Sequence, residues 1–304
     1  MTVDRGMPDA VWALAQYRTS RGVATGIITG DALLAAPPAL AERTVMELLH
    51  DWARWREVLH IIDLQALDPV DPVDAELAPP LTYPGKVICA GANYYDHADE
   101  MGVDPPDPAA DPFFFLKAPT TTIIGPSATV AIFDDGQAQV DWEAELAVVI
   151  GSRCHDIDIA GASQVIAGYA VANDISDRGS FHRSNSVAAP FEWDWLRHKS
   201  QDGFCPLGPG MVPAWLVPDP QSLKIRLDVN GHIKQDSTTA QMVVSVYGLI
   251  AAASRVMTLE PGDVILTGTP AGVGMPRRDF LRPDDIVTVE IEGVGRISNK
   301  VVIK

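Results

Sequence analysis

The chain of 304 residues is poor in cysteine and in long apolar runs. Its three cysteines, Cys89, Cys154 and Cys205, lie far apart and form no CxxC pair, which argues against a disulfide framework or a structural zinc site. We expect reduced thiols in a cytoplasmic protein. No run of 18 apolar residues occurs, so we expect no transmembrane helix. The polar N-terminal stretch over residues 1–15 does not resemble a signal peptide.

Basic residues are also scarce, since 23 of them face 40 acidic residues and the formal net charge is −17. Nucleic acid and anionic membranes are poor partners for such a surface, because both require basic patches. A small anionic substrate is not excluded, because a metal ion, a lysine or an arginine at the site can bind it. The sequence lacks GxSxG, HExxH and the GK[ST] ending of a P-loop. These absences disfavour serine hydrolases, HExxH zinc proteases and P-loop nucleotide binding.

Residues 1–80 are predicted to form a small N-terminal α+β domain with its linker, and residues 81–304 a catalytic domain. Val11–Tyr17 and Val23–Ile28 indicate a hairpin. A Thr-x-x-Glu capping box at Thr44 precedes apolar residues at helical spacing, which predicts an amphipathic helix over 45–62. Prolines and acidic residues between 68 and 80 indicate a linker.

The remainder of the chain predicts an α+β fold that is mainly β. Asn230-Gly231 stands between two apolar-rich arms and favours a type I′ hairpin turn. A helix is expected over 240–257. Strands do not alternate with helices, so we expect a barrel, roll or sandwich and not a doubly wound sheet. The expected strands are Lys86–Ala90, Ile123–Ile124, Glu145–Ile150, Val165–Ala172, Lys224–Val229, Val264–Leu266 and Ile286–Ile291.

The most informative segment is the strand that begins at Val140. Side chains two residues apart on a strand share a face, which groups Asp141, Glu143 and Glu145. The apolar run Leu146–Ile150 follows, so the strand enters the interior, where uncompensated carboxylates cost several kcal/mol each. A divalent cation would compensate them, whereas a solvated edge strand would need none.

Asp174 follows the buried strand 165–172 and is the third candidate ligand, although such a residue often belongs to a turn or cap. Three carboxylates without clustered His or Cys favour Mg²⁺ or Mn²⁺ over Zn²⁺. Ca²⁺ would need more oxygen ligands, although it could occupy the site in crystals.

Five segments resemble, in order, the conserved segments of the fumarylacetoacetate hydrolase family. The resemblance covers about residues 86–300 and is loose over the first 80. The family implies a β-roll or mixed β-sandwich catalytic domain, Mg²⁺ or Mn²⁺ as cofactor, and a homodimer. The segments are Gly91–Glu100, Asp141–Leu146, Asn173–Ser176, Lys199–Pro209 and Leu266–Gly274.

The resemblance also implies roles for individual residues. Glu143, Glu145 and Asp174 would be the metal ligands. Glu100, three residues from His97 and on the same face of a helical turn, would orient it as a general base for water. The alternative is two exposed polar residues on a loop. Lys199 would stabilise the charge of a developing enolate.

Substrate binding is expected of Tyr94, Arg178, Gly268 and Thr269. Arg178 could bind a carboxylate with two hydrogen bonds, and Thr269 could donate one. Gly268 would let the backbone approach the substrate closely. Lys117, a further candidate, either lines the pocket or has a structural role. Residues 102–112 are expected to form part of a lid.

The expected reaction is the hydrolysis of a carbon–carbon bond in a 2,4-dioxo acid, such as an acylpyruvate, a fumarylpyruvate or a diketo-deoxy sugar acid. The products would be a 2-oxo acid and a carboxylic acid. The alternative enzyme is an oxaloacetate decarboxylase or tautomerase, or a 2-oxo acid hydratase or isomerase. The alternative outside catalysis is a silent binding protein on the same fold.

One segment departs from the family pattern. Gly179 stands where an acidic residue is common, and Phe181 stands where glutamine is common. A longer stretch follows and carries Trp193 and Trp195. These aromatic residues either shape a larger, more apolar pocket or pack at a dimer interface.

Overall fold

The computed structural model of the protein describes residues 11–71, 76–104, 106–133 and 138–304. Residues 1–15 were predicted not to be a signal peptide, and most of them lie outside the described residues. So do residues 72–75 of the expected linker and residue 105 of the expected lid. None of the helices in the described ranges is long and apolar enough to cross a membrane.

The N-terminal part begins with the predicted hairpin. Strands β1 (Trp12–Thr19) and β2 (Gly22–Thr29) pair antiparallel, and β3 (Ala32–Ala35) joins β2. The capping box is confirmed, since Thr44 N donates to the Glu47 carboxylate at 2.7 Å and Glu47 N donates to Thr44 Oγ1 at 3.2 Å. The single helix predicted over 45–62 is wrong. Asp51 adopts non-helical backbone angles and separates α2 from α3. The helices of this part are α1 (Pro38–Ala41), α2 (Val45–Leu49) and α3 (Trp52–His60).

The described part of the expected linker is held against the N-terminal strands. Ala35 N donates to Asp68 O and Val70 N donates to Leu33 O, both at 2.8 Å. Strand β4 (Leu77–Ala78) pairs with β1. Strand β1 also pairs with β13 (Cys205–Pro213), so one sheet runs through both expected domains. The boundary near residue 80 stays a prediction.

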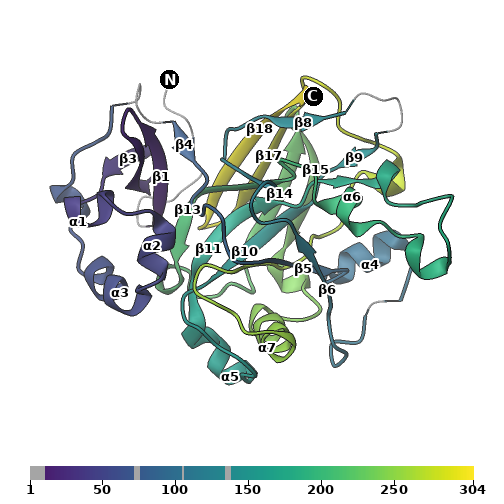
Figure 1. Ribbon diagram of the computed structural model, residues 1–304, viewed down its shortest axis with the longest axis horizontal. Coiled ribbons are helices and arrows are strands. Elements are labelled where there is room, and N and C mark those ends of the chain that lie inside the picture. Colours follow the sequence, from purple (N-terminus) through teal and green to yellow (C-terminus); the bar gives the residue numbers. More distant parts are fainter. Residues whose placement is uncertain (1–10, 72–75, 105, 134–137) are drawn as a thin grey trace.

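Two sheets form the body of the molecule (Figure 1). The large sheet has the order β3-β2-β1-β13-β11-β10-β16-β5-β6, with β4 beside β1 and β7 beside β13. The second sheet has the order β15-β14-β17-β18-β8. The remaining strands of the large sheet are β5 (Val87–Gly91), β6 (Phe113–Lys117), β7 (Ile123–Ile124), β10 (Ala144–Ile150), β11 (Ile166–Asn173) and β16 (Val264–Leu266). Those of the second are β8 (Val130–Ile132), β14 (Lys224–Val229), β15 (His232–Thr238), β17 (Ile286–Ile291) and β18 (Gly295–Ile303).

The seven predicted strands and the mainly β, α+β fold class are confirmed. Asn230 and Gly231 have φ angles of 54° and 77°, as the predicted hairpin turn requires. The helix expected over 240–257 begins only at residue 246, because Ser245 Oγ caps it by accepting from Gly248 N at 3.1 Å. The other elements are the strand pair β9 (Val140–Asp141) and β12 (Ser176–Asp177), and the helices α4 (Tyr95–Met101), α5 (Ile159–Ala162), α6 (Trp195–Lys199) and α7 (Val246–Val256).

Alternation along β10 divides the interior into two cores. Leu146 and Val148 pack in the core shared with the second sheet, together with Leu227 of β14. Ala147 and Val149 face the opposite core, which includes residues of α2 and α3. Glu145 has the same parity as Ala147, so it lies on this second side of the large sheet.

Candidate metal centre and active site

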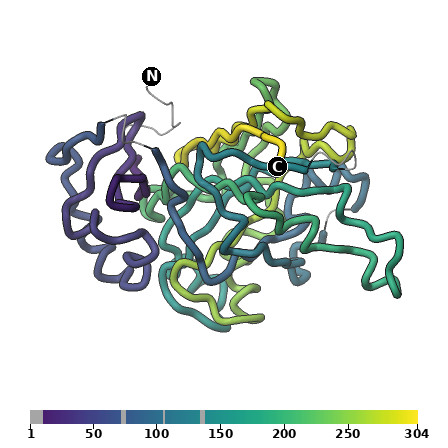
Figure 2. The backbone as a smooth tube through the Cα atoms, turned by 45° about the horizontal axis from the view of Figure 1, so that its top comes forward, coloured from purple at the N-terminus to yellow at the C-terminus, as the bar shows by residue number. Residues whose placement is uncertain are grey.

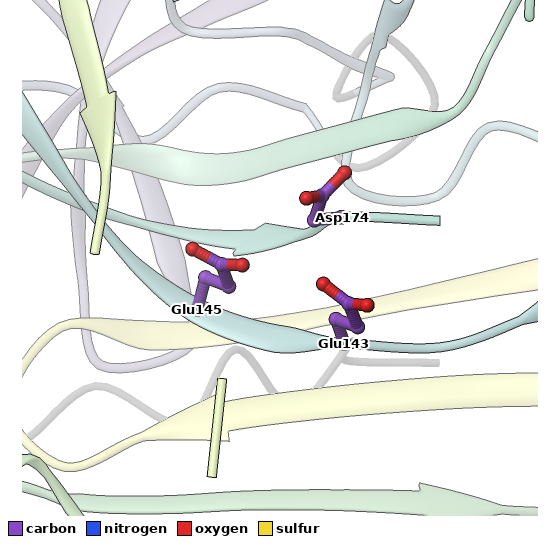
Figure 3. Close-up of side chains that lie close together, drawn as sticks. All are labelled: Glu143, Glu145 and Asp174. Carbon is purple, nitrogen blue, oxygen red and sulfur yellow. The ribbon is translucent and has the colours of Figure 1, made fainter. Parts of the chain in front are cut away.

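Three buried carboxylates meet where β10 begins and β11 ends (Figure 3). Glu143, Glu145 and Asp174 each offer an oxygen, and these atoms lie within 4.8 Å of one another. Pairing of the two strands sets Glu145 opposite Ala172, two residues before Asp174. Asp174 N also donates to Glu143 O at 2.8 Å. The structure therefore brings together the three predicted ligands.

Asp141 does not join this cluster, contrary to the expectation from alternation. The strand is interrupted at Trp142 and Glu143, between β9 and β10. Asp141 instead accepts from Gly274 N at 2.6 Å, from Met275 N at 3.0 Å and from Arg178 Nε at 3.1 Å. It therefore anchors a loop and an arginine beside the site.

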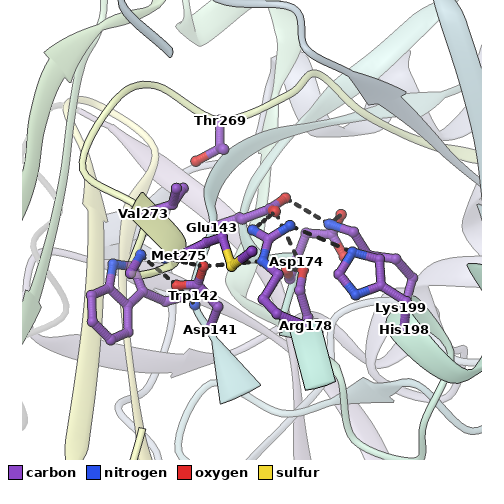
Figure 4. A network of polar contacts seen from close by, with 12 residues as sticks. Asp141, Trp142, Glu143, Asp174, Arg178, His198, Lys199, Thr269, Val273 and Met275 are labelled. Carbon is purple, nitrogen blue, oxygen red and sulfur yellow. Dashed lines mark hydrogen bonds and ion pairs between the residues drawn. The ribbon is translucent and has the colours of Figure 1, made fainter. Parts of the chain in front are cut away.

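Three cations surround the carboxylates (Figure 4 shows two of them). Lys199 Nζ donates to Glu143 Oε2 at 2.7 Å and to Asp174 Oδ2 at 2.8 Å. Arg178 Nη2 donates to Glu143 Oε1 at 2.6 Å, and Lys117 Nζ donates to Asp174 Oδ1 at 2.5 Å. Lys117 thus has an ion-pairing role beneath the site.

These contacts set the protonation of the cluster. Burial disfavours ionised Glu143, but Lys199 and Arg178 outweigh burial and hold the pKa of its carboxyl far below the usual value. Burial likewise disfavours charged Lys199, yet Asp174 and Glu143 raise the pKa of its ammonium. Both groups are therefore charged at neutral pH.

Glu145 is the one of the three carboxylates for which neighbouring cations do not outweigh burial. Its oxygen accepts from Gly268 N at 2.6 Å. Burial, followed by the charges of Asp174 and Glu143, raises the pKa of the Glu145 carboxyl well above its usual value. A divalent cation among the three carboxylates would remove this cost. The all-oxygen donor set therefore fits Mg²⁺ or Mn²⁺.

The predicted pair of His97 and Glu100 lies on one face of α4. His97 Nδ1 is 3.5 Å from Glu100 Oε2, too long for a strong hydrogen bond but placed for an orienting contact. Glu100 is itself fixed, because Gly272 N donates to it at 3.0 Å and Arg277 Nη1 at 2.8 Å. This arrangement leaves Nε2 of His97 as the nitrogen that can reach a substrate.

A pocket of about 390 Å³ connects these groups. Of the predicted site residues, His97, Glu143, Glu145, Arg178, Lys199 and Thr269 line it. Five do not contribute to the lining: Tyr94, Glu100, Lys117, Asp174 and Gly268. Tyr94 is fully buried in the core. Glu100 and Gly268 contact His97 and Glu145 of the lining from behind, and Lys117 contacts the buried Asp174.

Thr269 belongs to the closing loop, which we define as residues 268–277 and which overlaps the segment Leu266–Gly274 that resembles the family. Its hydroxyl oxygen accepts from Gln235 Nε2 at 2.8 Å, so the hydroxyl proton is available to a ligand. Gln235 also accepts from Ala144 N at 2.9 Å. Strand β15 thereby fixes the closing loop to the start of the strand that carries Glu145.

Comparisons with known proteins agree with this geometry. The family model "Fumarylacetoacetate (FAA) hydrolase C-terminal" matches residues 86–302. The chain belongs to the fumarylacetoacetate hydrolase family. It is 45% identical to the mitochondrial oxaloacetate tautomerase of Xenopus laevis over 74% of this chain and 68% of that protein. A mitochondrial oxaloacetate tautomerase of Homo sapiens is 45% identical over 73% and 68% of the two chains.

Solved structures of the fumarylacetoacetate hydrolase family extend the likeness to the N-terminal part. Maleylpyruvate hydrolase from Sphingobium sp. SYK-6, in complex with manganese(II) ion and pyruvate, matches with a TM-score of 0.74 and 28% identity. The match covers 96% of this chain and 99% of that one. Fumarylacetoacetate hydrolase from Exiguobacterium antarcticum matches with a TM-score of 0.81 and 31% identity, over 96% and 100% of the chains.

Sequence reasoning missed several residues of the site. His198 and Phe115 line the pocket, and Arg277 holds Glu100. Alternation in the run Phe113–Lys117 could have indicated that Phe113 and Phe115 share a face. Nothing local in the sequence indicates Arg277, because its partner lies 177 residues away.

Proposed function

We propose that this chain is a divalent-metal-dependent tautomerase that interconverts the keto and enol forms of a 2-oxo acid of the oxaloacetate type. The observation that carries the proposal is the imidazole of His97, which lines a pocket together with Lys199, Glu143 and Glu145, beside the buried Asp174. Identity of 45% to proteins named oxaloacetate tautomerases supports it. The alternative reading of the sequence is thus better supported than hydrolysis.

The residues of the chain suit a proton transfer at C3 of the substrate. His97 takes the proton as the C3–H bond breaks, and the electron pair forms the C2=C3 bond. The electrons of the C2=O π bond move to the oxygen at C2, where the Lys199 ammonium stabilises the negative charge until the proton held by His97 returns to that oxygen through water. Glu100 keeps the imidazole in place, because its own carboxylate is held by Gly272 and Arg277.

Glu143, Glu145 and Asp174 would hold the divalent cation, which when bound acts as a Lewis acid towards a substrate carbonyl. With a divalent cation bound, the charge of the site would be positive and would favour an anionic substrate. Arg178 and Lys199 supply positive charge at the pocket wall, in a chain whose net charge is −17. The site therefore compensates locally for an acidic surface.

Hydrolysis of an acylpyruvate is the second candidate. It is favoured by the likeness to maleylpyruvate hydrolase, whose structure contains manganese(II) and pyruvate. The same His97 would then activate a water molecule in place of deprotonating C3. Both reactions need the metal site, so the substrate assay has to separate them.

The test follows enol–keto exchange of oxaloacetate by ultraviolet absorbance, with Mn²⁺, Mg²⁺ or EDTA, beside pyruvate release from acylpyruvates. We expect metal-dependent exchange that falls by about 10²–10⁴-fold in His97→Gln, the usual contribution of a general base. His155→Gln, a change at an exposed histidine, is the matched control and should retain exchange. Metal-dependent pyruvate release without exchange would replace the proposal by the hydrolase reading.

A further inference from the structure

The pocket has two chemically different halves. One half contains Glu143, Glu145, Arg178 and Lys199. The other half is apolar. We call it the aromatic wall and define it as the four aromatic residues Phe113, Phe115, Phe181 and Trp195 together with the adjoining Met101. Phe113 and Met101 remain 53% and 43% exposed, although both are large apolar side chains. The wall therefore presents an apolar surface that a ligand could cover.

Trp195 is the centre of the aromatic wall. Its ring centroid lies 5.2 Å from that of Phe113, 5.0 Å from Phe115 and 4.9 Å from Phe181. Phe113 and Phe115 come from one face of β6, whereas Phe181 and Trp195 bound the segment 181–195, which extends from the body of the molecule at the right of Figure 2. Trp193 packs on Phe181 at 4.9 Å but does not line the pocket.

The cations of the lining are already engaged by carboxylates. Lys199 contacts Glu143 and Asp174, and Arg178 contacts Glu143 and Asp141. Lys199 is the lining cation beside the aromatic half, with its Nζ 5.2 Å from the ring centroid of Phe115, and its ammonium is already shared by Glu143 and Asp174. A second carboxylate of a substrate would therefore lose water there without gaining an ionic partner, which is unfavourable.

His198 does not supply the missing charge. Its ring stacks on Phe181 with a centroid distance of 4.3 Å, and its Nδ1 lies 3.0 Å from Asp177 O. Burial, and then the charges of Lys199 and Arg178, lower the pKa of His198 to about 3. At neutral pH this imidazole is therefore uncharged and extends the apolar side of the pocket.

We propose that the aromatic wall receives a flat apolar substituent on C3 of the substrate, so that the preferred substrates are aryl-substituted 2-oxo acids. This inference rests on the proposed tautomerase function. An aryl group conjugated with the C2=C3 bond keeps the enol planar, and its ring can stack among Phe113, Phe181 and Trp195. The reaction needs no co-reactant, because the proton that leaves C3 passes to His97 and the oxygen at C2 gains one.

The test compares kcat/KM for enol–keto exchange of phenylpyruvate and of oxaloacetate in the Mn²⁺-loaded protein. We expect a phenylpyruvate to oxaloacetate ratio of at least about ten, the factor that 1.4 kcal/mol of stacking would give. Trp195→Ala should reduce this ratio about tenfold. Phe133→Ala, at a half-exposed aromatic residue outside the pocket, should leave the ratio unchanged.

A second variant keeps the inference testable if Trp195→Ala does not fold. Phe181→Gln introduces the residue that is common in the family and should shift the ratio towards oxaloacetate. Exchange of oxaloacetate without a preference for phenylpyruvate would overturn the inference and leave the proposed function standing. Absence of exchange with both substrates would overturn both.

Discussion

Four buried carboxylates face three cations in and beside the metal cluster. The carboxylates are Asp141, Glu143, Glu145 and Asp174, and the cations are Lys117, Arg178 and Lys199. Burial, and then the charges of Asp174 and Glu143, raise the pKa of the Glu145 carboxyl. Function rather than stability accounts for such an arrangement, because an uncompensated buried charge is costly.

Replacing Glu145 by glutamine tests this balance. The amide oxygen can still accept from Gly268 N, while the like-charge repulsion disappears. We expect Glu145→Gln to be more stable than the wild type in EDTA, because burial and the charges of Asp174 and Glu143 disfavour the ionised carboxyl. Thermal unfolding without metal measures it. Destabilisation of the variant would show that the carboxylate is already compensated.

His198 predicts an acid-sensitive component of stability. Its pKa is lowered to about 3 in the fold, whereas an unfolded histidine titrates near 6.5. Between these pH values the unfolded chain binds a proton at His198 that the folded chain does not bind. The free energy of unfolding therefore falls as the pH drops from about 6.5 towards 3. At pH 5 the loss amounts to about 2 kcal/mol. Denaturant unfolding of His198→Gln should show less decline between pH 7 and pH 5 than the wild type, and parallel declines would refute the argument.

At the scale of elements, the closing loop 268–277 is the structural link between the parts of the site. Its backbone N–H groups hold three carboxylates, since Gly268 donates to Glu145, Gly272 to Glu100 and Gly274 to Asp141. Arg277 adds an ion pair to Glu100. Displacing the loop should therefore disturb the metal cluster and the His97 side of the pocket together.

Gly272→Ala is the direct test of the loop. Gly272 has a φ of +110°, and an added Cβ would lie 2.1 Å from Lys234 O, so the backbone has to move. Gly293→Ala is the matched control, because its φ is +70° but nothing lies within 4 Å. We expect both to cost about 1 kcal/mol of strain and Gly272→Ala to cost more and to lose activity. Equal melting temperatures and activities would contradict the role of the loop.

Sequence patterns predicted most elements of the large sheet, because the hydrophobic pattern within each strand reflects which of its own residues are buried. The run Leu146–Ile150 is an example, and Asn230-Gly231 likewise marked the turn between β14 and β15 of the second sheet. The interruption at Trp142 escaped prediction, because it depends on bonds from Asp141 to Gly274 and Arg178, which are distant in sequence. The break between α2 and α3 was not predicted, because apolar residues continue at helical spacing across it.

At the scale of the whole molecule, the fold collects the site from five separated segments. His97, Glu143, Asp174, Lys199 and Thr269 come from different elements, yet their pairing and packing bring them to one end of the large sheet. The ligands were predictable from alternation and family resemblance. The ion pair of Lys117 with Asp174 was not, because it arises from contacts across the sheet. A pocket role for Trp195 was one of two alternatives, but its packing against Phe113 and Phe115 of β6 could not be predicted. The expected homodimer and cytoplasmic location stay predictions.

The metal site is the basis of the whole account, and calorimetric titration of the metal-free protein with Mn²⁺ tests it most directly. We predict one site for each chain in the wild type, retained in Glu57→Gln, an exposed glutamate of α3. Binding should be lost in Glu143→Gln, which removes one of the three carboxylates. Equal Mn²⁺ binding by the wild type and Glu143→Gln would contradict the assignment of Glu143, Glu145 and Asp174 as the metal centre.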